Sequence, residues 1–192
     1  MAPILIAIFA VAVITFVAVP FLIYNRLVHL RNLTRESWRD IDTELQRRYD
    51  LVPNLVSTVK GYAAHEQQTF EAVTAQRADA MAATREPDEQ APREQALGRG
   101  VGRLLAVAEQ YPELLASTQF LALQRELTDT EDRIQVARRI YNANVRAYDT
   151  LVQTFPTLFI ARSFGFAARP FFELDPVVRA AGPPPVDLSG TP

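Results

Sequence analysis

The apolar positions of residues 113–155 recur with the spacing of one face of a long helix. Alternating steps of three and four from Phe120 reach Leu123, Leu127, Thr130, Ile134, Ala137, Tyr141, Asn144, Tyr148, Leu151 and Phe155. Most of these residues are apolar or aromatic, which indicates a heptad stripe. At about 1.5 Å per residue the helix spans roughly 60 Å. One helix cannot bury its own stripe, so the pattern predicts partner helices of similar length.

Three more segments carry apolar stripes, and prolines or polar residues separate them. We expect helices over residues 27–49, 50–84 and 94–110, with a polar connection over 85–93. Pro53 either starts the second of these helices, with Asp50 as its N-cap, or kinks one continuous helix. Ser117 or Thr118 is expected to cap the long fourth helix. No period-two pattern is sustained, so we predict an all-α fold, an antiparallel four-helix bundle.

The N-terminal run from Pro3 to Ile23 contains no charged residue. As a helix it spans about 32 Å, close to the roughly 30 Å of a bilayer's hydrocarbon core. No basic residue precedes the run, and no small-residue cleavage pattern follows it, which favours a retained transmembrane helix over a signal peptide. Basic residues follow at Arg26, Arg31, Arg35 and Arg39. The positive-inside rule therefore predicts a single-pass protein of the inner membrane, with its N-terminus outside and its bundle in the cytoplasm.

Composition narrows the function further. The 192 residues carry a net charge of −2, and arginines alternate with acidic residues, so no nucleic-acid partner is expected. The absence of cysteine excludes disulfides, thiolate nucleophiles and cysteine-based metal sites. We expect three regions, a transmembrane anchor over 1–24, a helical bundle over 25–173 and a disordered Pro-rich tail over 174–192.

The side chains that could support chemistry are few. The only histidines are His29 and His65, and the positions three residues before them hold Arg26 and Tyr62 instead of the glutamates of a di-iron bundle. Thr69 stands where a zinc-binding helix starting at His65 needs a second histidine. No serine lies in a Gly-x-Ser-x-Gly setting. The sequence therefore predicts no metal, no cofactor and no enzymatic activity.

Phenylalanines cluster near the C-terminal end of the bundle region, where six of the eleven fall within residues 155–172. The candidate interaction segment comprises Phe159, Arg162, Phe164, Phe166, Arg169, Phe171 and Phe172. One interpretation is that these rings cap the end of the bundle. The other is that basic and aromatic residues together dock a partner or the bilayer interface. Burial of Phe171 and Phe172 against the core excludes docking by those two rings.

Several longer motifs are specific enough to compare with known families. The longest is Arg-Arg-Tyr-Asp-Leu-Val-Pro-Asn-Leu-Val at 47–56, and others occupy 24–28, 37–42, 59–66, 104–112, 123–131, 137–142, 164–166 and 171–173. Together they resemble the LemA family of bacterial membrane proteins over residues 24–173. The resemblance implies an N-terminal transmembrane helix, an all-α bundle and membrane organisation as one family role, but no established activity or cofactor. Departures from the family pattern at Leu158 and at 117–119 lie at helix ends, where they affect local capping and not the fold.

These observations favour a non-catalytic scaffold or adaptor at the bacterial cytoplasmic membrane. Its expected partners are the lipid bilayer, through residues 1–24, and membrane or peripheral proteins, and a homo-oligomer remains open. The alternative is an envelope-facing sensor or binding protein with the bundle outside the cytoplasm. Mapping the topology distinguishes these two functions.

Overall fold

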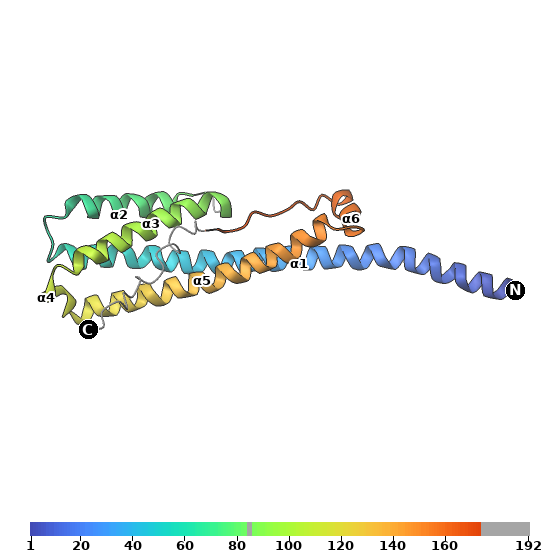
Figure 1. Cartoon of the computed structure of the whole chain (residues 1–192), viewed down its shortest axis with the longest axis horizontal. Coiled ribbons are helices and arrows are strands. Elements are labelled where there is room, and N and C mark those ends of the chain that lie inside the picture. Colours follow the sequence, from blue (N-terminus) through green and yellow to red (C-terminus); the bar gives the residue numbers. More distant parts are fainter. Residues whose placement is uncertain (84–85, 174–192) are drawn as a thin grey trace, which may run out of the picture.

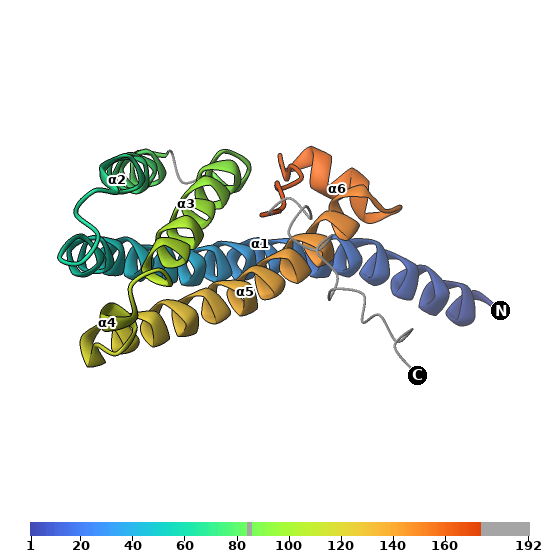
Figure 2. The ribbon, with the colours of Figure 1, turned by 60° about the vertical axis from the view of Figure 1, so that its left-hand side comes forward.

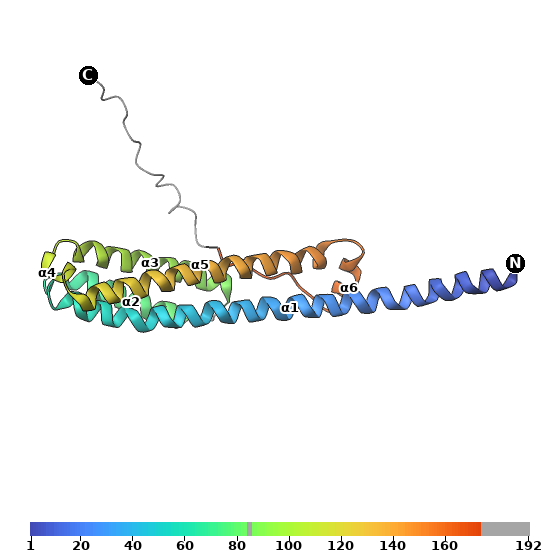
Figure 3. The ribbon, with the colours of Figure 1, turned by 90° about the horizontal axis from the view of Figure 1, so that it is seen from below.

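The computed structural model describes residues 1–83 and 86–173, which form six helices and contain no strand. They are α1 (Ala2–Lys60), α2 (Gln67–Met81), α3 (Pro87–Ala108), α4 (Pro112–Leu115), α5 (Thr118–Gln153) and α6 (Thr157–Ser163). Helices α1, α2, α3 and α5 alternate in direction and lie side by side (Figures 1 and 3). The predicted all-α fold, an antiparallel four-helix bundle, is therefore confirmed. The tail predicted over 174–192 lies outside the described residues.

Helix α1 is continuous from the apolar N-terminal run to the far end of the bundle, with Pro20 and Pro53 inside it. Of the two alternatives for Pro53, one continuous helix is correct. Proline has no N–H, so the helical ladder leaves the carbonyl of Tyr49 without its usual donor. Arg77 of α2 supplies that donor, because its Nε bonds to the Tyr49 carbonyl oxygen at 2.6 Å. The single helix expected over 50–84 is wrong, since α1 ends at Lys60 and α2 begins at Gln67.

This contact gives a first prediction. Replacing Arg77 with leucine is expected to lower the free energy of unfolding by about 1.5 kcal/mol, the lower end for a hydrogen bond from a charged group. In a Pro53→Ala background the restored N–H at position 53 can bond to the Tyr49 carbonyl, so Arg77→Leu costs less there. Urea unfolding of the full chain in detergent micelles, followed by circular dichroism, measures both losses. Equal losses in the two backgrounds contradict this role of Arg77.

The stripe of α5 predicted partner helices of similar length, and this prediction is wrong for two of them. Helix α2 has 15 residues and α3 has 22, whereas α5 has 36. Four helices therefore pack together only in the half of the bundle farther from the N-terminus. In the nearer half, α6 and the extended residues after it lie beside α1 and α5 (Figures 1 and 2). A second, smaller core fills this half, formed by Leu27, Leu30, Tyr148, Val152, Ala161 and Phe166.

The ends of α3 and α5 differ from the predicted bounds. Helix α3 starts at Pro87 instead of residue 94, with Pro87 in its first turn followed by Asp88 and Glu89. This order suits a helix start, because proline lacks the unpaired N–H and acidic residues complement the helix dipole. Helix α5 starts after Ser117, whose hydroxyl accepts a hydrogen bond from the Phe120 N–H at 3.4 Å. The predicted cap at Ser117 is thus correct, while residues 112–115 form the separate helix α4.

Candidate functional site

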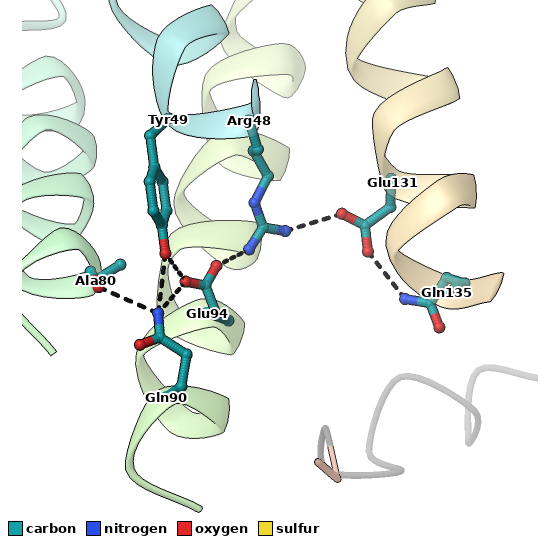
Figure 4. A network of polar contacts seen from close by, with 7 residues as sticks. All are labelled: Arg48, Tyr49, Ala80, Gln90, Glu94, Glu131 and Gln135. Carbon is teal, nitrogen blue, oxygen red and sulfur yellow. Dashed lines mark hydrogen bonds and ion pairs between the residues drawn. The ribbon is translucent and has the colours of Figure 1, made fainter. Parts of the chain in front are cut away.

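A buried ion pair lies in the four-helix half of the bundle (Figure 4). Arg48 of α1 contacts the carboxylate of Glu94 on α3, and its other terminal nitrogen donates to Glu131 of α5 at 2.9 Å. The side chains of Arg48 and Glu94 are 6% and 1% exposed, whereas that of Glu131 is 44% exposed. Glu94 is therefore a fully buried carboxylate, and the Arg48 guanidinium is the cation that balances it.

Neutral groups complete this network. The Tyr49 hydroxyl donates to Glu94 Oε1, and Gln90 Nε2 donates to the Tyr49 hydroxyl at 2.9 Å and to the Ala80 carbonyl at 3.1 Å. Through these bonds the network reaches α1, α2, α3 and α5 (Figure 4). All of the bonds form together only when the four helices are aligned as seen here. The network therefore favours one register of the bundle over its alternatives.

The network makes a prediction about alkaline pH. Burial, and after it the neighbouring Glu94 carboxylate, raises the pKa of Tyr49 well above its ordinary value of 10.0. Burial also raises the pKa of Tyr141 to about 12. The unfolded chain loses these protons above about pH 10 while the folded chain keeps them, so stability falls as pH rises beyond that point. Tyr49→Phe is expected to reduce the slope of this fall in urea unfolding between about pH 9 and about pH 11. An unchanged slope contradicts the assignment to Tyr49.

The network of Arg48, Tyr49, Gln90, Glu94 and Glu131 stabilises the bundle and leaves no free group of its buried carboxylate to bind a ligand. Its one fully buried carboxylate already receives bonds from Arg48, Tyr49 and Gln90. Across residues 1–83 and 86–173, no group of three or more histidine, cysteine, aspartate or glutamate side chains is arranged to hold a metal ion. Sequence reasoning missed Gln90, because it placed residues 85–93 in a loop, and it missed Glu94, because it placed that residue at the exposed start of the helix expected over 94–110. Pro87 and the two acidic residues after it were the available signal.

The candidate interaction segment divides into buried and exposed residues. Phe166 and Phe172 are 6% and 0% exposed, and Phe171 is partly buried against the main core. Phe172 packs edge-on against Trp38, with 5.3 Å between ring centroids, and the Arg31 guanidinium lies 5.0 Å from the Phe166 ring. Arg169 is half-buried, so the residues of the segment that stay exposed are Phe159, Arg162 and Phe164.

Residues 166–173, here called the strap, run extended from α6 back along α5 (Figure 1). Three α5 side chains hold the backbone of the strap. Asp149 accepts from the Arg169 N–H at 3.0 Å, and Tyr141 donates to the Pro170 carbonyl at 2.8 Å. The Asn142 amide accepts from the Phe172 N–H at 3.0 Å and donates to its carbonyl at 3.1 Å. Such side-chain-to-backbone contacts have no periodic signature, so sequence reasoning did not find them.

A groove lies between α1 and α5. It has a volume of about 450 Å³ and is lined by Asp40, Thr43, Glu44, Asp132, Arg133, Val136, Ala137 and Ile140. Val136 and Ile140 are 46% and 51% exposed, so apolar side chains reach solvent between charged neighbours.

The fold and these surfaces define a class, a membrane-associated helical bundle with an apolar N-terminal helix. Among the described residues, α1 is the one helix long and apolar enough to cross a membrane, with a window of mean hydropathy 2.9 in which no residue is buried. The family model of the LemA family matches residues 37–187, and the chain belongs to that family.

Relatives in magnetic bacteria extend the match over most of the chain. The magnetosome proteins MamQ 1 and MamQ 2 of Paramagnetospirillum magneticum are each 26% identical over 197 residues, covering 90% of this chain and 72% of the relative. MamQ of Magnetospirillum gryphiswaldense is 24% identical with the same coverage.

Proposed function

We propose that this chain is a non-catalytic scaffold or adaptor that holds partner proteins at the cytoplasmic membrane. The observation that carries the proposal is the continuity of α1, which runs from Ala2 to Lys60 without a break. The apolar segment and the first helix of the bundle are one rod, so the bundle projects from the membrane with no flexible linker. A body held in this way presents its side faces at fixed heights above the lipid.

The groove between α1 and α5 is the proposed partner surface. Its exposed apolar residues, Val136 and Ile140, lie next to Asp40, Asp132 and Arg133. An amphipathic helix of a partner fits such a groove, with apolar anchors on the floor and polar residues at the rim. The relatives named as magnetosome proteins support a role at a membrane.

Photo-crosslinking in native membranes tests this function. A benzophenone amino acid at Val136 or Ile140 is expected to give discrete adducts with one or a few proteins. The same probe at Arg125, an exposed position on α5 outside the groove, serves as the control. Adducts that are equally diverse at all three positions contradict a specific partner surface.

The proposed orientation rests on the basic residues that follow the apolar run. Arg26, Arg35 and Arg39 are exposed, which is compatible with a position at the cytoplasmic face. Because the chain has no cysteine, Glu113→Cys provides a single thiol at the far end of the bundle. A membrane-impermeant maleimide is expected to label it only after spheroplasts are lysed. Labelling of intact spheroplasts favours the envelope-facing sensor or binding protein instead.

A further inference from the structure

Three phenylalanines around α6 form a second exposed apolar surface, here called the aromatic tip. Phe155, Phe159 and Phe164 are 76%, 60% and 61% exposed. Among the described residues beyond the apolar run, no other large apolar side chain is as exposed. The rings of Phe155 and Phe159 pack edge-on with 5.9 Å between centroids, so these two side chains form a pair, and all three belong to α6 or its immediate ends.

The aromatic tip lies beside the end of the apolar run of α1. The ring of Phe164 contacts that of Tyr24 at 4.9 Å between centroids, and Ile160 packs in the same core cluster as Ile23 and Tyr24. Ile23 is the last residue of the aliphatic run of α1, and the first charged side chain after it is Arg26. Residues 2–23 span about 33 Å as a helix, enough to fill a hydrocarbon core of about 30 Å. In a spanning α1, Tyr24 therefore falls at the membrane–water boundary, and α6 packs at the same level through Ile160.

We propose that the aromatic tip inserts into the headgroup boundary of the leaflet from which α1 emerges, as a second membrane contact. Aromatic rings are favoured at this depth, where one part of the ring is in lipid and another near water. Exposed Arg162 lies between Phe159 and Phe164 in the sequence, and exposed Arg26 follows Tyr24 by two residues, so both suit lipid phosphates at this level. Two contacts, the α1 span and the tip, fix the tilt of the bundle against the membrane. The proposal rests on the membrane anchoring of α1 and is independent of the scaffold role.

Lipid is favoured over a protein as the occupant because of this location. A surface at the level of Tyr24 is surrounded by headgroups whenever residues 2–23 span the bilayer. The tip is also held in place, because Ile160 and Ala161 pack into the core beside Leu27. It cannot fold back to bury its rings in the bundle, whose nearby core position is already filled by Phe166.

Single-cysteine variants of the full chain test the proposal. Phe155→Cys, Phe159→Cys and Phe164→Cys place a bimane fluorophore on the tip, and Leu115→Cys places it on α4 at the opposite end of the bundle as the control (Figure 1). Each protein is embedded in lipid nanodiscs, at one copy and in a separate sample at two copies per particle, with and without lipids spin-labelled near the headgroup. Circular dichroism confirms equal helix content before the comparison.

The expected result is a blue-shifted emission at 155, 159 and 164 that the spin-labelled lipids quench, with neither effect at 115. Arg162→Gln is expected to lessen the quenching at 159 in nanodiscs that contain anionic phosphatidylglycerol. Unquenched emission at all three tip positions, equal to that at 115, overturns the proposal. A blue shift that appears without lipid quenching and only with two copies per disc also overturns it, in favour of a second copy. Adducts at Val136 and Ile140 report on the scaffold function separately.

Discussion

Glu94→Ala is expected to be among the most destabilising single substitutions in this bundle, with a loss of about 3–5 kcal/mol in the free energy of unfolding. The Glu94 side chain is 1% exposed and Arg48 is 6% exposed, so removing the carboxylate leaves a buried cation with only the half-exposed Glu131 as a partner. The same change removes the acceptor of the Tyr49 hydroxyl. Urea unfolding of the full chain in micelles, followed by circular dichroism, measures the loss.

Two controls separate a buried charge from simple loss of contact. Glu131→Ala removes the other carboxylate on Arg48, but that side chain is 44% exposed, so a cost of about 1 kcal/mol or less is expected. Arg48→Met combined with Glu94→Leu removes both charges and fills the space with apolar atoms, and this double variant is expected to regain most of the loss. If the double variant is as unstable as Glu94→Ala, the unbalanced Arg48 charge is not the cause.

The periodic pattern of apolar residues predicted most of the buried residues of α5. The α5 stripe correctly marks Phe120, Leu127, Ile134, Tyr141 and Tyr148 as core residues. Near the end of α5, Val145 and Val152 are buried, whereas the predicted positions Asn144 and Leu151 are only partly buried. Phe155, the last position of the stripe, lies beyond the end of α5 at Gln153. A straight helix has 3.6 residues per turn, so a strict heptad drifts off the buried face over several turns.

Features that depend on contacts between distant residues could not be predicted in the same way. The carbonyl of Tyr49 that Pro53 leaves without a helical donor is satisfied by Arg77, a residue 24 positions after the proline, and no local pattern around Pro53 predicts that contact. Sequence patterns also could not predict the burial of the aromatic segment, because Phe164 and Phe166 are two residues apart and yet one is exposed and the other buried. Gly165 between them has a positive φ of 69°, which turns the chain from α6 into the strap. The clustering of phenylalanines identified this segment as important but could not show which rings are buried and which are exposed.

Phe172→Ala is the second substitution with a large expected effect, a loss of about 3–5 kcal/mol for a fully buried phenylalanine. The ring is 0% exposed and packs on Trp38 at 5.3 Å, while Asn142 holds the backbone at the same residue through two hydrogen bonds. Losing the ring leaves a cavity between α1, α5 and the strap. The strap can then detach without unfolding the four-helix half, so the loss in global stability is limited by the free energy of strap opening.

The single tryptophan reports on this opening directly, because Trp38 is partly buried and contacts both Tyr141 and Phe172. Phe172→Ala is expected to shift Trp38 emission to the red as water reaches the ring, and Asn142→Ala is expected to do so to a smaller extent. Phe159→Ala, a change of an exposed ring on α6, is the matched control and should leave the emission unchanged. Since both strap substitutions act on one opening, their combined cost should fall short of the sum of the two. Trp38 emission that stays unchanged in Phe172→Ala shows that the strap holds without this ring.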